Sequence, residues 1–169
     1  MRTEGQALVR GGELSLPWNL GEWVDPATLR AWVEEEIATL DWGNPAVLEY
    51  LRRRPGYDPR RLLALVSFAY LTGTFESEEV EHRIRSDEEM VKIASGASRP
   101  FVADGLSRFR RENRGLVKWV VAQVLKRALR AQLGDAPVPA GLKRRILDAA
   151  ATRVDQARQL DHSREREDI

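Results

Sequence analysis

The residues of this sequence that are best suited to chemistry are the arginines and lysines of one stretch, residues 98–119. Residues 99–130 hold nine lysines and arginines against two acidic residues, a local net charge of +7 in a protein whose total is +1. Apolar residues recur among these cations at helical spacing and form one stripe, which consists of Leu106, Phe109, Leu116, Val117 and Val120. A helix that buries this stripe and turns its arginines elsewhere suits the binding of phosphate groups.

The same basic surface also has a plain structural explanation. Arginines on an amphipathic helix often form only a solvated face, and residues 76–92, which carry a net charge of −4, could neutralise them within the protein. Composition therefore leaves two classes of function open, a DNA-binding protein and a helical bundle that binds other proteins.

Catalytic chemistry finds little support in the sequence. The chain has no cysteine, and its two histidines, His82 and His162, are far apart, so thiolate and histidine nucleophiles or metal sites are not expected. Glu34, Glu35 and Glu36 are consecutive, and consecutive residues on a helix diverge by about 100°, which favours a mainly solvated face over a metal cluster. No glycine-rich phosphate loop is present. We therefore expect no enzyme activity, no cofactor and no metal.

The lack of cysteine also suits a reducing cytoplasm. The N-terminus shows no signal peptide, and the longest nearly apolar run, residues 62–71, is about half of the roughly 20 residues that a membrane span requires. We expect a soluble cytoplasmic protein that does not bind membranes.

The elements that must position the cations are predicted to be helices. Asp25 with Pro26 and Asp58 with Pro59 are N-cap signals, and residues 58–73 are apolar around nearly the whole circumference, which marks a central helix. The predicted helices span residues 25–41, 44–54, 58–73, 77–84, 87–94, 104–112, 113–134 and 141–159. No segment alternates like a strand. The predicted fold is all-α, a compact bundle of about eight helices with a helix-turn-helix-like basic region.

Three segments make up the predicted domain organisation. Residues 1–24 contain four glycines and two tryptophans without helical periodicity, and we interpret them as an irregular arm. Residues 25–134 form the main helical domain. Residues 135–169 supply a last helix and a charged tail that is expected to fray after about residue 159.

Four short motifs resemble a known family. They are PWNL at 17–20, YDPRRLLALVSFAYLTG at 57–73, the spacing of Ser77, Glu81 and Asp87, and Pro100 followed by SRFRREN at 107–113. In this order they resemble the N-terminal domain of InsH-type insertion-sequence transposases, the DDE-class enzymes of bacterial mobile elements, over residues 17–129. The resemblance implies a helical module that precedes an RNase H-like catalytic domain and recognises the terminal inverted repeats of the element.

The sequence departs from that family in two places. Gly105 stands where the family usually has threonine, so the capping of the helix is expected to pass to Asp104. The chain ends at Ile169 before any segment that resembles the catalytic domain with its three acidic metal ligands. Two-metal cleavage of DNA is therefore not expected from this polypeptide.

The resemblance implies double-stranded DNA as the partner, and nucleoid association when DNA is bound. The predicted contact residues are Ser107, Arg108 and Arg111 on the groove side, and Arg99, Arg110, Arg114 and Lys118 on phosphates. The alternative is a truncated transposase relic that uses its tryptophan-containing arm and last helix to bind a second copy or an intact transposase.

Overall fold

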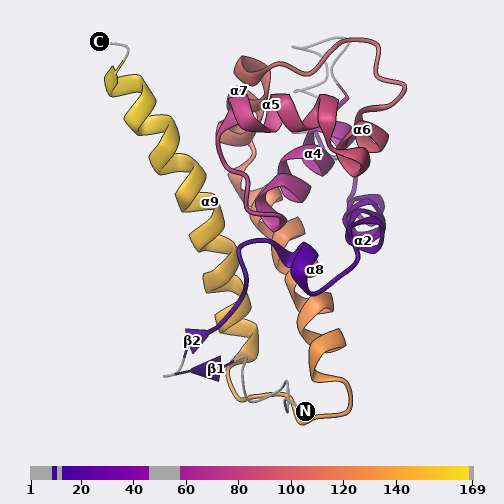
Figure 1. The fold of residues 1–169 in the computed structure, drawn as a ribbon, viewed down its shortest axis with the longest axis vertical. Helices are drawn as coiled ribbons and strands as arrows, with labels where there is room; N and C mark the ends of the chain where they lie inside the picture. Colours follow the sequence, from indigo (N-terminus) through magenta and orange to yellow (C-terminus); the bar gives the residue numbers. More distant parts are fainter. Residues whose placement is uncertain (1–8, 11–12, 46–57, 168–169) are drawn as a thin grey trace.

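Helices make up most of the part of the chain that the computed structural model describes, residues 9–10, 13–45 and 58–167 (Figure 1). The α-helices in this part are α2 (Pro26–Ala38), α4 (Pro59–Leu71), α5 (Ser77–Ser86), α6 (Glu88–Ala94), α7 (Ala103–Glu112), α8 (Arg114–Leu133) and α9 (Leu142–Glu167). A 3-10 helix, η1 (Leu20–Glu22), precedes them, together with a two-residue antiparallel ladder between β1 (Val9–Arg10) and β2 (Glu13–Leu14). The predicted all-α bundle is confirmed.

The described residues contain seven α-helices, against the prediction of about eight. The helix predicted over residues 44–54 falls largely within 46–57, outside the described residues. The other seven predicted helices each correspond to one in the structure, with ends that differ mostly by one to three residues.

Helix α4 is the centre of the bundle, as its uniformly apolar sequence predicts. Every residue from 62 to 71 is buried. The Asp58 side chain caps the helix by accepting hydrogen bonds from the backbone N–H groups of Arg60 and Arg61 at 3.0 and 3.4 Å. Gly73 follows the helix with φ at +83°, and a Cβ there would lie 3.2 Å from the Trp18 carbonyl oxygen. Glycine therefore lets the N-terminal arm lie against the end of α4.

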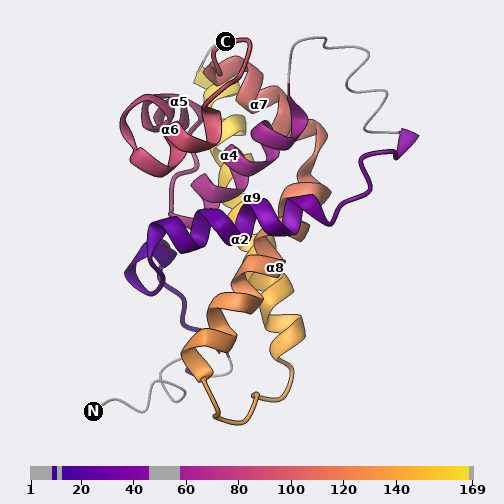
Figure 2. The same ribbon diagram turned by 90° about the vertical axis from the view of Figure 1, so that its right-hand side faces the viewer.

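Helix α2 crosses α8 at a steep angle (Figure 2) and is joined to it by charge as well as by apolar packing. Arg127 of α8 donates to Glu36 at 2.9 Å and also pairs with Glu35. The Glu36 side chain is only 14% exposed. The prediction of a solvated glutamate face on α2 is therefore wrong for Glu36, because an arginine 91 residues away in sequence binds it.

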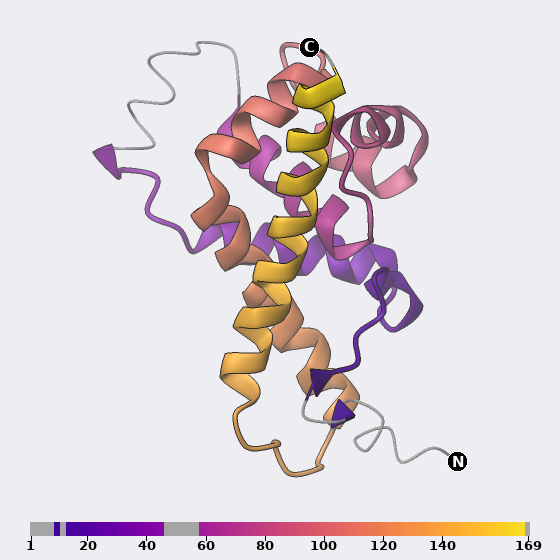
Figure 3. The same cartoon turned by 90° about the vertical axis from the view of Figure 1, so that its left-hand side faces the viewer.

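Helices α8 and α9 form an antiparallel hairpin, and α9 runs along one side of the whole molecule (Figures 1 and 3). The predicted end of α9 near residue 159 is wrong, because the helix continues to Glu167. Ion pairs to neighbouring helices hold this extension: Asp161 with Arg110, Arg164 with Glu78, and Glu165 with Arg111. They supply the tertiary contacts that a frayed end lacks.

A buried arginine of α9 fastens the N-terminal arm. Arg153 is 3% exposed, and its guanidinium donates to the backbone carbonyls of Pro17, Trp18 and Tyr70. It also lies 5.4 Å from the centre of the Trp18 ring. Burial lowers the pKa of Arg153 to about 10, still well above neutral pH, so the group stays charged and neutralises the carbonyl dipoles at the end of α4.

Candidate nucleic-acid interface

The predicted contact residues lie mainly on α7 and on the first turns of α8. A single residue, Asn113, separates the two helices, and its side-chain amide donates to the Phe109 carbonyl at 2.9 Å. A helix-turn-helix motif joins its helices by a turn of about three or four residues. The structure thus shows two consecutive basic helices here and does not show the predicted helix-turn-helix-like arrangement.

The apolar stripe that anchors these helices is buried as predicted. Leu106 and Phe109 of α7 are 1% and 2% exposed, and Val117 and Val120 of α8 are 1% and 0% exposed. Leu116 is half-buried. Phe109 is therefore a core residue that holds α7 in place, and its ring is not presented to a nucleic-acid base.

The start of α7 is capped by a neighbouring helix. Val102 occupies the N-cap position without a side-chain cap, and the Ala103 N–H donates to the Glu81 carboxylate of α5 at 2.9 Å. The expected capping by Asp104 is therefore wrong, because α7 begins one residue earlier and Glu81 already accepts its first free N–H. Capping from α5 fixes the position of α7 relative to the core.

A second contact between α5 and α7 joins two serine hydroxyls. Ser77 Oγ and Ser107 Oγ lie 2.6 Å apart, and Ser77 is 3% exposed. Glu76 occupies the N-cap position of α5, and Ser77 is the first helical residue. The predicted groove contact Ser107 is half-buried and has its hydroxyl engaged within the protein. The Ser107 hydroxyl therefore helps to hold α7 against α5 and is not presented to DNA.

Asp87 lies at the junction of α5 and α6 and makes hydrogen bonds to both helices. Its carboxylate caps α6 by accepting from the Glu89 and Met90 N–H groups at 3.1 Å, and the hydroxyl of the preceding Ser86 donates to the His82 carbonyl. The Arg83 guanidinium pairs with Asp87 at 2.9 Å. Burial acts to raise the pKa of Asp87, but these hydrogen bonds and the Arg83 charge outweigh it and hold the pKa below its ordinary value.

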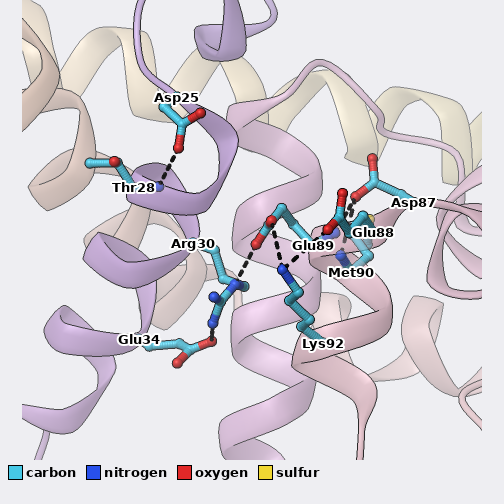
Figure 4. A network of polar contacts seen from close by, with 9 residues as sticks. All are labelled: Asp25, Thr28, Arg30, Glu34, Asp87, Glu88, Glu89, Met90 and Lys92. Carbon is cyan, nitrogen blue, oxygen red and sulfur yellow. Dashed lines mark hydrogen bonds and ion pairs between the residues drawn. The ribbon is translucent and has the colours of Figure 1, made fainter.

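Helix α6 is in turn tied to α2 by a charged network (Figure 4). Arg30 pairs with Glu89 and Glu34, and Lys92 lies 3.4 Å from both Glu88 and Glu89. The hydrogen bond from Arg30 lowers the pKa of Glu89, whose side chain is only 9% exposed, and outweighs the opposing effect of burial. Within this network the cations and acids of α2 and α6 neutralise one another, so its acids do not pair with the basic residues of α7.

Four of the predicted contact residues are exposed and one is half-exposed. Arg99, Arg108, Arg111 and Arg114 are exposed, and Lys118 is half-exposed. Among the described residues, no carboxylate forms an ion pair with Arg99, Arg108, Arg114 or Lys118. Arg111 is different because it pairs with Glu165 of α9 at 3.3 Å, although both side chains remain about half exposed.

Arg110 does not share this surface. It is 5% exposed, and its guanidinium holds Asp161 of α9 through two hydrogen bonds and donates a third to the Phe75 carbonyl. The expectation that Arg110 points outward with its neighbours is therefore wrong. It lies four residues after Leu106 and next to Phe109, so its direction on the helix falls on the buried face. That spacing was the sequence signal that could have identified it as a core residue.

The supporting residues Glu81, Arg83 and Asp161 were not predicted as part of the site. Glu81 belongs to a motif whose spacing is visible in the sequence, but nothing local shows that its partner is an N–H 22 residues away. Asp161 lies in the charged segment that was expected to fray, and it contacts Arg110 across 51 residues. Such partners become visible only when helices pack.

No described helix combines the length and apolar character that crossing a membrane requires. In residues 9–10, 13–45 and 58–167, no three His, Cys, Asp or Glu side chains gather in a way that could hold a metal ion. In comparisons with family models, curated proteins and solved structures, the chain has no significant match.

Proposed function

We propose that this chain is a DNA-binding module of the transposase N-terminal type that has no catalytic function of its own. One observation carries the proposal: Arg99, Arg108, Arg114 and Lys118 present positive charge at the surface, and no carboxylate of the described residues pairs with them. By contrast, Arg30, Arg83 and Arg127 are each paired with acids. Unpaired cations that are mounted on rigid helices suit the phosphates of a duplex.

Within this proposal the contact residues take different roles. Arg108 and Arg111 of α7 face the groove, while Arg99, Arg114 and Lys118 bind phosphates. Ser107 and Arg110 move from the contact set to the support of α7, because their polar groups are engaged within the protein. The order of the four transposase-like motifs favours the terminal inverted repeats of a mobile element as the DNA target.

The test is a fluorescence anisotropy titration of the whole chain against a duplex that carries the inverted repeat of a flanking element, with a shuffled duplex as reference. The double variant Arg108→Ala/Arg114→Ala should weaken binding by about a hundredfold, since the groove contact of Arg108 and the phosphate contact of Arg114 are each worth about 1.5 kcal/mol. Lys143→Ala/Arg144→Ala removes the same charge from α9 at the other end of the hairpin and should leave binding nearly unchanged. Equal losses in both variants would contradict a localised site.

The alternative function makes the opposite prediction. A relic that binds a second copy or an intact transposase through its arm and last helix should form a defined oligomer in light scattering and show no affinity for any duplex. Trp18 of the arm is 52% exposed and is the most exposed of the described aromatic residues that such a contact could use. A monomer that binds duplex DNA would exclude this alternative.

A further inference from the structure

A cavity of about 270 Å³ lies between the start of α4 and the loop that joins α6 to α7. Asp58 and Arg61 line it on the α4 side, and Gly96, Arg99 and Phe101 line it on the loop side. Arg99 is one of the exposed cations of the proposed DNA interface, but Arg61 lies on a different element and was not part of any predicted site. Two arginines that are 38 residues apart in sequence thus line the same cavity.

The Arg61 side chain extends from α4 to the loop that joins α6 to α7. Its Nη1 pairs with Asp58 at 2.9 Å, and its Nη2 lies so close to Gly96 that a Cβ there would be 3.1 Å away. Gly96 has φ at +82°, a conformation that side-chain-bearing residues rarely adopt. The glycine therefore allows the guanidinium to lie directly against the loop backbone.

The cavity carries an excess of positive charge. The Asp58 carboxylate is already engaged by Arg61 and by the backbone N–H groups of Arg60 and Arg61 at the start of α4. Arg99 approaches from the other wall, and among the described residues it has no acidic partner. One guanidinium is thus free, and the other has only part of its five N–H donors in use.

The geometry points to a phosphate-binding site in this cavity, with Arg61 and Arg99 as its ligands. Guanidinium groups bind phosphate through paired, charge-assisted hydrogen bonds, which a single point charge cannot provide. The phosphate can come from the backbone of a duplex that contacts Arg99 or from a free phosphate ester. The cavity shares Arg99 with the proposed DNA interface but does not depend on that function.

The first experiment titrates inorganic phosphate into the isotopically labelled whole chain at constant ionic strength and follows backbone amides by NMR. We expect saturable shifts at Gly96 and Arg99, and an affinity that is about threefold to tenfold lower in Arg61→Gln. Arg60→Gln is the matched control, because Arg60 is the neighbouring residue on α4 but its guanidinium lies over the Trp42 ring, 4.9 Å from its centre, and does not line this cavity. Arg99→Gln, on an exposed loop, provides a second variant if Arg61→Gln does not fold.

The same variants in duplex titrations identify the source of the phosphate. Weaker duplex binding in Arg61→Gln but not in Arg60→Gln would assign the cavity to the DNA backbone. If phosphate causes saturable shifts but Arg61→Gln binds the duplex as well as the wild type does, the cavity binds a free phosphate ester and the proposed DNA function is unaffected. If phosphate causes saturable shifts but the wild type binds no duplex, the cavity again binds a free phosphate ester, and the proposed DNA function is contradicted. The inference is overturned if phosphate moves no amide around the cavity, or if Arg60→Gln and Arg61→Gln lose phosphate affinity equally.

Discussion

Arg110 and Arg108 are two residues apart on α7 and have opposite environments. Arg110 is 5% exposed and bound to Asp161, whereas Arg108 is exposed and has no acidic partner among the described residues. A helix turns by about 200° over two residues, which places the two guanidinium groups on opposite faces. Identical residue types therefore serve the core and the surface of one helix.

This contrast predicts different effects of removing each arginine. Arg110→Ala leaves Asp161 as a largely buried carboxylate without its partner and should lower the free energy of unfolding by about 3–5 kcal/mol. Arg108→Ala should change it by no more than about 0.5 kcal/mol. Urea denaturation followed by circular dichroism measures both values. Similar small effects for the two variants would mean that the Arg110–Asp161 pair contributes little to the fold.

Glu89 predicts a dependence of stability on pH. Its pKa is lowered below the ordinary value of 4.5 mainly by the hydrogen bond from Arg30, so its contribution is present above pH 4.5 and is lost as the pH falls through the lowered pKa. The stability difference between the wild type and Glu89→Gln should be largest at neutral pH and should shrink steadily below about pH 5. Denaturant titrations at several pH values measure this difference.

Glu88 supplies the control for that measurement, because its side chain is 82% exposed and lies one residue away. Glu88→Gln should follow the wild-type acid profile closely. If Glu89→Gln lost stability in acid as steeply as the wild type, the Arg30–Glu89 pair would not be a source of the acid sensitivity.

At the scale of whole elements, the cap of α7 by α5 is the contact that most directly positions the proposed interface. Glu81→Ala leaves the Ala103 N–H without its acceptor and should destabilise the start of α7 by about 1 kcal/mol. Hydrogen exchange should accelerate in the first turn of α7 while α4 stays protected. Glu79 is an exposed residue of α5, and Glu79→Ala should leave hydrogen exchange unchanged both in α7 and in α4. Unaltered exchange in Glu81→Ala would show that packing alone holds α7.

The limits of prediction also appear at this scale. Helix starts at Asp25 and Asp58 were predictable because capping is a local contact between a side chain and N–H groups two or three residues on. The central position of α4 was predictable from its apolar circumference. The cap from Glu81, the end of α9 and the pairing of Arg110 with Asp161 were not, since each depends on a partner in another helix, and one chain segment does not specify its tertiary neighbours.

The molecule as a whole separates its charges into paired and unpaired regions. Acids of α2, α5 and α6 pair with nearby arginines and lysines. Cations without an acidic partner among the described residues remain on the surface at Arg99, Arg108, Arg114 and Lys118, and also near the turn of the hairpin at Lys126, Arg130, Lys143 and Arg144. The nearly neutral total charge of +1 conceals this separation. Duplex binding by such a surface should therefore be driven by the release of counterions, in the manner of proteins that are basic overall.

This separation predicts the salt dependence of duplex affinity. If Arg99, Arg114 and Lys118 each contact one phosphate, the logarithm of the affinity should fall with the logarithm of salt concentration with a slope of about −2.7. Removing Arg114 should reduce the magnitude of the slope by about 0.9. Anisotropy titrations over a series of salt concentrations measure it. A slope near zero would show that these three cations do not contact phosphates.

The contacts of Arg153 also have a consequence for the order in which the chain acquires its structure. The carbonyls of Pro17 and Trp18 are 136 and 135 residues away from the guanidinium that binds them. On the ribosome, where the chain emerges from its N-terminus, the arm cannot dock in this way until residue 153 has been synthesised. We therefore expect attachment of the arm to be a late step of folding, after the α4 core has formed around nearer neighbours in the chain.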